Sequence, residues 1–128
     1  MFVRFPKDTA SISWTNHIKN KMAFYGLSES KIKSILSYPK RKEEGIAPDT
    51  FASMKRNDKK NRKEEIWVMY IDKKNKMKVS TLKKRSKILM ISAWRYPGVS
   101  KVGAQIPIPE DMLSELGGFF KLPEESLL

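Results

Sequence analysis

Apolar residues near the start of the chain recur with the spacing of an α-helix. Four of them between residues 13 and 25 follow one another at intervals of four, four and three: Trp14, Ile18, Met22 and Tyr25. These intervals place the four side chains on one face of a helix. Gly26, directly after this stretch, is a favoured residue at the end of a helix. The pattern therefore predicts a first helix over residues 13–25.

A second helical pattern follows immediately. The side chain of Ser28 can accept hydrogen bonds from the free amides at a helix start. Ile32, Ile35 and Leu36 have the spacing of a buried helical face, and Pro39 ends the helix. Because the link between the two helices is so short, we predict that they form a hairpin.

From residue 50 onward the apolar pattern becomes that of β-strands. Three runs rich in β-branched and aromatic residues are predicted strands: Thr50–Met54, Ile66–Ile71 and Ile88–Trp94. The last run is nearly all apolar, so we expect it to be the central strand, buried on both faces. Residues 40–48 indicate a connection or an irregular strand, and residues 2–5 can add one more strand.

The end of the chain predicts a short helix. Pro109 with Glu110 and Asp111 is typical of a helix start, and Gly117-Gly118 of a helix end. Two helices precede the main strands, so we predict an α+β fold, with the helical hairpin on one face of an antiparallel β-sheet meander. The crossovers of a parallel sheet are not indicated. Residues 1–118 form the predicted single domain, and residues 119–128 a C-terminal tail.

Composition narrows the class of protein. With 128 residues the chain has room for one compact domain. It has no cysteine, which excludes disulfides, thiolate metal sites and a cysteine nucleophile. No apolar stretch has the length of a membrane span, and the N-terminus lacks the pattern of a signal peptide. We therefore expect a cytoplasmic protein that does not bind membranes.

The charge predicts an anionic partner. Lys and Arg number 26 against 14 Asp and Glu, which gives a net charge of +12 and a pI near 9.9. Nucleic acid is the first expectation, although an anionic membrane surface or an acidic protein satisfies the same electrostatics and charge alone does not choose among the three. Basic side chains concentrate in residues 55–63 and 73–87, both expected to be loops. The RNA-binding candidates there are Lys55, Arg56, Lys59, Lys60, Arg62, Lys63, Lys83, Lys84 and Arg85. The alternative is a non-specific, solubilising surface.

Few residues are candidates for catalysis. His17 is the one histidine and has the ordinary pKa of a general acid or base, about 6.5, but alone it cannot anchor a histidine-based metal site. Arg95 and Tyr96 end a buried strand at a turn, where an arginine can bind phosphate and Tyr96 or Trp94 can stack on a base. The side chains of the adjacent acids Glu64-Glu65 diverge, so they indicate solvated charge or partners of a helix dipole. We expect no metal and no cofactor.

Two stretches resemble a known family. Residues His17–Ser28, with Ile32, Ile35 and Pro39 after them, are similar to the opening of small toxin-like domains related to BrnT and, more distantly, RelE. Those domains begin H-x-x-x-R-M-x-x-R-G-[IL]-[ST]. Residues Ile88–Tyr96 resemble their closing strand. Lys21 and Tyr25 stand here where arginines are usual.

The resemblance implies an α+β fold in proteins that act as metal-independent ribonucleases or as toxins held by a partner antitoxin. The leading hypothesis is thus an RNA-binding toxin-like protein that cleaves mRNA or ribosome-associated RNA. In it His17 is the acid–base group, Lys21 and Arg95 stabilise phosphate, and Tyr96 completes the site. The alternatives are a non-catalytic basic module that binds nucleic acid or the ribosome, and a partner of an acidic antitoxin.

Overall fold

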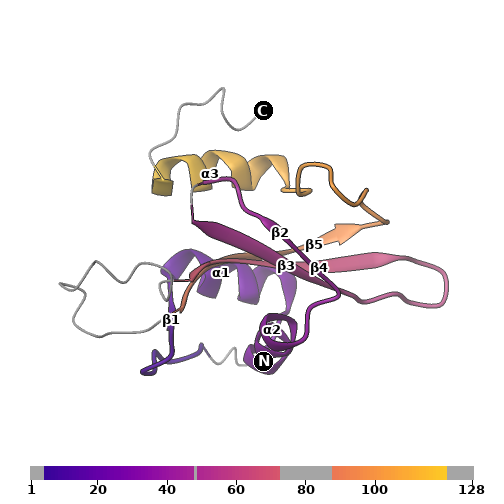
Figure 1. The fold of residues 1–128 in the computed structure, drawn as a ribbon. Coiled ribbons are helices and arrows are strands. Elements are labelled where there is room, and N and C mark those ends of the chain that lie inside the picture. Colours follow the sequence, from indigo (N-terminus) through magenta and orange to yellow (C-terminus); the bar gives the residue numbers. More distant parts are fainter. Residues whose placement is uncertain (1–4, 48, 73–87, 121–128) are drawn as a thin grey trace.

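The computed structural model describes residues 5–47, 49–72 and 88–120. These residues form an α+β fold with a five-stranded mixed sheet and three helices (Figure 1). In chain order the elements are β1 (Ile12–Trp14), α1 (Asn16–Tyr25), α2 (Glu29–Ser37), β2 (Arg41–Glu44), β3 (Thr50–Arg56), β4 (Glu64–Asp72), β5 (Ile88–Pro97) and α3 (Glu110–Phe120). The strand order in the sheet is β1-β5-β4-β3-β2.

The predicted antiparallel meander is confirmed for β2 to β5 but not for the whole sheet. β1 pairs with β5 in parallel, with Ile12 opposite Ile88 and Trp14 opposite Met90. Between these two strands α1, α2 and the other three strands form the long connection that a parallel pair needs. The expected central strand is also wrong, because β4 occupies the middle of the sheet, although β5 is buried on both faces. Of the strand expected at residues 2–5, residues 2–4 lie outside the described ones and Phe5 is in no strand.

The first helix begins later than its apolar spacing predicted. Thr15 is the N-cap, and its Oγ1 accepts a hydrogen bond from the Ile18 amide at 3.1 Å. Trp14 is therefore the last residue of β1, and it reaches the same buried cluster as Ile18 from a strand. At the other end Gly26 adopts the left-handed conformation, with a φ of 68°. The predicted Ser28 cap of α2 is confirmed by a 3.1 Å bond from the Lys31 amide.

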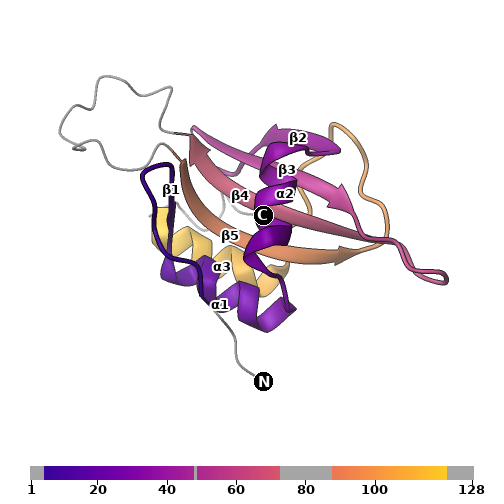
Figure 2. The ribbon, with the colours of Figure 1, turned by 90° about the horizontal axis from the view of Figure 1, so that it is seen from below.

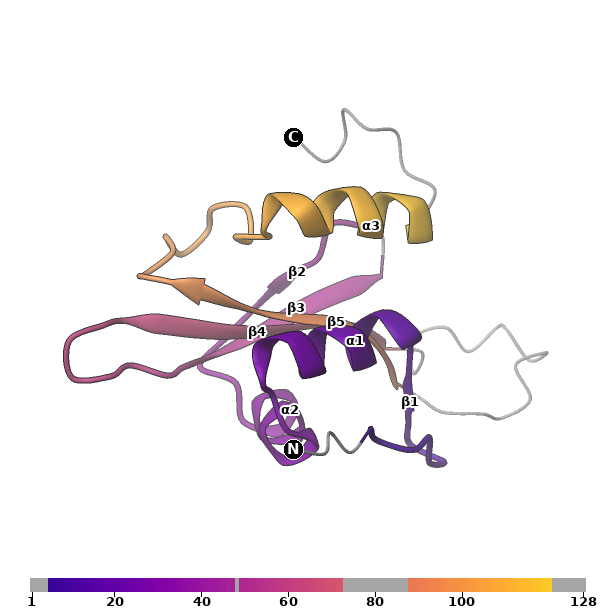
Figure 3. The ribbon, with the colours of Figure 1, turned by 180° about the vertical axis from the view of Figure 1, so that it is seen from behind.

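The helices cover both faces of the sheet. The α1–α2 hairpin packs on one face, as predicted, and α3 packs on the other (Figures 1 and 3). Met112 and Leu116 of α3 are fully buried against Trp67 and Trp94 of the sheet. α3 continues through Gly117 and Gly118 to Phe120, so the predicted helix end and the predicted domain boundary at residue 118 fall inside this helix. Burial of its apolar face outweighs the weak helix propensity of the two glycines.

The edge of β5 positions α1. β1 pairs with residues 88–90 of β5. Thr15, the residue after β1, continues along this edge: its amide donates to the Met90 carbonyl at 3.1 Å and its Oγ1 donates to the Ile91 carbonyl at 2.9 Å. Tyr25, at the far end of α1, packs partly against both buried clusters. Figure 2 shows α1 beside β5, with its C-terminal end on the side of the sheet toward the β3–β4 connection.

Candidate nucleic-acid interface

The connection between β3 and β4 is a basic hairpin that projects from the sheet (Figures 1 and 2). The backbones of Lys59 and Arg62 bond to each other, at 2.7 and 3.2 Å, across a two-residue turn. Four exposed cations lie at this tip: Lys59, Lys60, Arg62 and Lys63. Among the residues that the structure describes, none of the four has an acidic partner within 4 Å. We call these four residues the tip cations.

The base of the hairpin carries two buried carboxylates instead. Glu64 and Glu65 open β4, and their side chains lie on opposite faces of the sheet because neighbouring strand residues alternate. Glu64 is 6 % exposed and Glu65 is 0 % exposed. The prediction that these acids are solvated is therefore wrong. The physical reason is that arginines from distant segments of the chain neutralise them inside the fold.

Glu65 lies at the centre of a polar network. Its Oε2 accepts hydrogen bonds from Arg56 at 3.0 Å and from the Ser100 amide at 2.8 Å. Its Oε1 accepts from the Trp67 indole at 2.9 Å and from the Ser100 hydroxyl at 2.7 Å, and Arg41 lies 3.9 Å from Oε2. Burial alone would raise the pKa of Glu65, but the Ser100 and Trp67 hydrogen bonds and the Arg41 charge lower it below its ordinary value.

Glu64 performs the same role on the other face. Its Oε1 accepts from Asn57 at 2.7 Å and from Arg95 at 2.9 Å. Burial raises the pKa of Glu64, yet the Asn57 hydrogen bond and the charge of Arg95 outweigh burial, and the pKa lies below its ordinary value. Both carboxylates are therefore ionised at neutral pH, and both bind arginines across the hairpin base.

The predicted basic cluster at residues 55–63 thus divides into two groups. Arg56 donates hydrogen bonds to Glu65 and to Asp58, and the bond that it donates to Asp58 raises the pKa of Arg56. Lys55 donates to the Ser34 hydroxyl of α2 at 2.7 Å. These two cations hold structural elements together, whereas the tip cations remain available for a ligand.

Arg95 has several partners inside the protein. Its Nε donates to the Tyr25 carbonyl at 2.7 Å, and its second terminal nitrogen lies 3.4 Å from the Gly26 carbonyl. Both carbonyls belong to the C-terminal end of α1, where free backbone acceptors need donors. With its bond to Glu64, Arg95 links α1 to the base of the hairpin. About 30% of its side chain remains exposed.

The two aromatic residues beside Arg95 pack into the cluster on the α3 side of the sheet. Trp94 is 0 % exposed, and its ring stacks on Trp67 with 6.2 Å between the ring centroids. The predicted stacking of Trp94 on a base is therefore wrong, because the α3 side of the core encloses the indole. Tyr96 is half-buried on that same face, opposite Glu65 in the register.

His17 and Lys21 meet a third residue, Glu115 of α3. His17 Nε2 lies 2.9 Å and Lys21 Nζ 3.2 Å from the same oxygen, Oε1. These two hydrogen bonds lower the pKa of Glu115. The other ring nitrogen of His17, Nδ1, is buried and has no hydrogen-bond partner among the described residues. Neither nitrogen is free for a substrate, because one binds Glu115 and the other is enclosed.

The structure does not bring the four predicted catalytic residues together. His17 lies in the first turn of α1 and Arg95 binds the carbonyls at its last turn, so eight residues, or about 12 Å of helix, separate the two points. Arg95 and Tyr96 face opposite sides of the sheet. The second basic cluster, residues 73–87 with Lys83, Lys84 and Arg85, lies outside the described residues.

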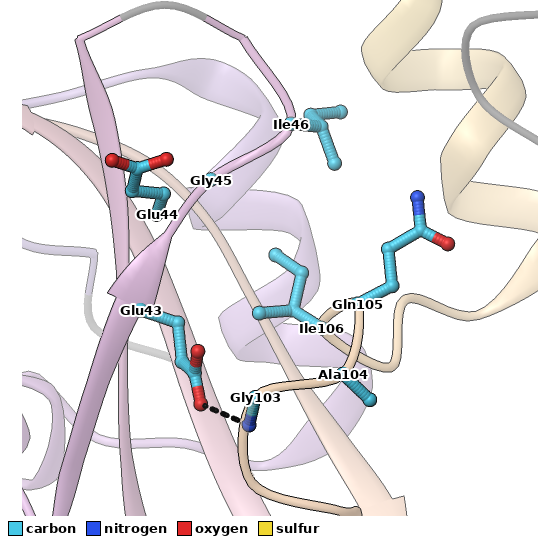
Figure 4. A pocket seen from close by; sticks show the side chains of 8 residues that line it. All are labelled: Glu43, Glu44, Gly45, Ile46, Gly103, Ala104, Gln105 and Ile106. Carbon is cyan, nitrogen blue, oxygen red and sulfur yellow. Dashed lines mark hydrogen bonds between the residues drawn. The ribbon is translucent and has the colours of Figure 1, made fainter.

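A pocket of about 460 Å³ lies elsewhere, between the end of β2 and residues 103–106. Figure 4 shows Ile106 pointing from that segment toward β2, and Glu43 bonded to the Gly103 amide at 3.5 Å. Two carboxylates, Glu43 and Glu44, line the pocket, and none of the predicted site residues does. Its charge does not complement an anionic ligand.

Two exposed aromatic residues were missed by the sequence analysis. Phe24 of α1 is 73 % exposed and Tyr38, after α2, is 75 % exposed. The signal for Phe24 is present in the sequence, since two residues after Met22 it falls about 200° around the helix from the buried stripe. An aromatic residue on a polar helix face is a candidate contact residue.

The chain matches no protein-family model, no curated protein and no solved structure. The relationship to BrnT and RelE therefore stays a prediction. In the described part of the chain, no three acidic, histidine or cysteine side chains gather as metal ligands do. None of the helices there has both the length and the apolar character of a membrane span.

Proposed function

We propose that this protein is a non-catalytic RNA-binding module that grips the phosphate backbone with its β3–β4 hairpin. The observation that carries the proposal is the contrast within one hairpin. In the described part of the chain its tip holds four exposed cations with no carboxylate within 4 Å, and its base is fixed by two buried, ionised carboxylates. RNA is chosen over other anions because the +12 charge favours a long polyanion and the two resembling stretches indicate an RNA partner.

A fixed base gives the tip cations a defined position before RNA arrives. Each cation that neutralises a phosphate releases a counterion, so affinity depends steeply on salt. Four contacts predict that the tip contributes about 3 to the slope of log affinity against log salt concentration, taking 0.7 per contact with a single strand.

Binding is favoured over cleavage by the placement of the proposed catalytic groups. Metal-free RNA cleavage needs a base, an acid and a cation around one phosphate. Here His17 is hydrogen-bonded to Glu115 at one end of α1. At the other end, Arg95 donates hydrogen bonds to Glu64 and to backbone carbonyls. The metal-independent ribonuclease remains the competing hypothesis, and it predicts RNA fragments.

The decisive experiment compares two variants of equal charge. In the tip variant, glutamine replaces Lys59, Lys60, Arg62 and Lys63. In the control, glutamine replaces four other exposed lysines: Lys7, Lys40, Lys42 and Lys101. Each loses four charges, so the net charge of both falls from +12 to +8. We expect the tip variant to lose most of its RNA affinity in fluorescence anisotropy, with a salt slope smaller by about 3, and the control to retain wild-type slope within about 1.

Three results would overturn the proposal. Equal losses in both variants would show that net charge alone drives binding, without a site. Absence of RNA binding by the wild type at low salt would favour an acidic protein partner instead. RNA cleavage in the presence of a metal chelator, abolished by His17→Ala, would establish the ribonuclease.

A further inference from the structure

We propose that Phe24 stacks on an unpaired base, so that the RNA bound by the hairpin is single-stranded where it passes the C-terminal end of α1. This inference rests on the proposed function, because it names the class of RNA that the same surface binds. It begins from the 73 % exposure of a phenylalanine that contributes to neither buried cluster.

The ring of Phe24 is held in position although it is exposed. It meets Tyr25 edge to face, with 4.8 Å between ring centroids and 89° between the ring planes. The ammonium group of Lys21 lies 5.5 Å from the ring centroid. Tyr25 itself is half-buried, and its hydroxyl reaches Met112 of α3 at 4.0 Å. A ring fixed in this way loses little further freedom when a base stacks on it.

A chain of contacts connects this ring to the tip cations. Tyr25, the next residue, offers its carbonyl to Arg95, and Arg95 binds Glu64 at 2.9 Å. Glu64 directly follows Lys63, one of the tip cations. Figures 2 and 3 agree that α1 ends on the side of the sheet from which the hairpin projects. The end of α1 that carries Phe24 and the basic hairpin therefore lie toward the same end of the sheet.

This combination favours single-stranded RNA. A groove or ridge of cations that follows the phosphates, with an aromatic ring for a base, is the usual way proteins bind unpaired strands. Duplex RNA keeps its bases stacked inside the helix and presents phosphates and hydroxyl groups instead. The phenyl ring has no hydrogen-bonding group, so stacking on it selects an unpaired base without selecting its identity.

The test uses substitutions at Phe24 that separate aromatic character from apolar size. We expect F24L to weaken binding to an unstructured RNA of about 12 nucleotides by about 5- to 150-fold, the range measured for losing one stacked base. F24W, which keeps an aromatic face, should stay within about threefold of wild type. Both Phe24 variants should bind the corresponding duplex, and inorganic polyphosphate, as tightly as the wild type does. Thermal unfolding verifies that each variant is folded.

F24W also supplies a direct signal. The three natural tryptophans, Trp14, Trp67 and Trp94, are at most 5 % exposed, so the substituted position carries the single exposed indole of the variant. Its emission should be quenched by the single strand and unchanged by the duplex.

The outcomes separate this inference from the proposed function. If F24L binds the single strand as tightly as the wild type while the tip variant loses it, stacking is refuted and the hairpin proposal stands. If F24L weakens binding to the single strand and to the duplex equally, Phe24 does not discriminate between single-stranded and duplex RNA, and the inference fails. If the wild type binds neither RNA, the proposed function itself is wrong.

Discussion

The tip and the base of one hairpin use their positive charges differently. At the tip, three lysines and one arginine are exposed and have no described carboxylate within 4 Å, although the charges of Arg62 and Lys63 act on Glu64 and Asp58 from farther away. At the base, Arg56 and Arg95 bind buried glutamates, and Arg41 approaches one of them. Arginine suits the base because its planar group offers several donors in fixed directions and is easier to desolvate than an ammonium group. Neighbouring basic residues can therefore have different roles: those that bind a buried carboxylate stabilise the fold, and those that stay exposed are available for a ligand.

Removing the carboxylate at the centre of the base should have the largest effect on stability. Glu65→Gln leaves Arg56 and Arg41 without their shared buried anion, so we expect the free energy of unfolding to fall by about 3–5 kcal/mol. Urea denaturation measures it. Glu44→Gln, at an exposed position on β2, is the matched control and should change stability by less than about 0.5 kcal/mol. Similar values for both variants would contradict the structural role of Glu65.

Replacing Arg95 should have the second-largest effect on the free energy of unfolding. Arg95→Met removes the donors to the Tyr25 and Gly26 carbonyls and the partner of Glu64, at a cost of about 1–3 kcal/mol. Arg95→Lys keeps the charge but cannot span all three acceptors, so its loss should be intermediate. Hydrogen exchange at the end of α1 should speed up in both. An Arg95→Met protein as stable as the wild type, with RNA binding lost, would instead assign Arg95 directly to the ligand.

Low pH should reduce the stability that Glu64 and Glu65 contribute at the base of the hairpin, and it should do so in a defined range of pH. The folded-state pKa values of Glu64 and Glu65 lie below their ordinary value of 4.5, so the folded protein binds these protons more weakly than the unfolded chain. Their stabilisation is complete above the ordinary value and is lost as pH falls through the folded-state values. Urea midpoints between neutral and acidic pH should therefore fall more steeply for the wild type than for Glu65→Gln. Parallel curves would contradict the ionised state of Glu65.

The smallest effect on stability belongs to the tip. Replacing Lys59, Lys60, Arg62 and Lys63 by glutamine should change the free energy of unfolding by less than about 0.5 kcal/mol, because exposed charges that make no close ion pair contribute little. Relief of repulsion in a chain of net charge +12 gives the change a stabilising sign. Thermal and urea unfolding measure it. A loss above about 1 kcal/mol would mean that the tip is part of the structural network.

Local sequence determined the elements whose causes lie within a few residues. The Ser28 cap, the left-handed Gly26 and the apolar runs of β3, β4 and β5 could be predicted because caps, turns and strand periodicity depend on neighbouring residues. Net charge and the basic run at residues 55–63 were also readable in the same way. These features established the class of the fold and the sign of the expected ligand.

Tertiary structure alone decided which side chains face solvent. Trp14 joined a parallel strand, Trp94 entered the core, and Glu64 and Glu65 were buried with arginines from other segments. Arg95, expected at a phosphate, binds the end of a helix 69 or 70 residues earlier in the chain. Such contacts join residues far apart in sequence, and periodicity records only which face of an element is apolar. It cannot record which distant charge will meet that face when the sheet and helices pack together.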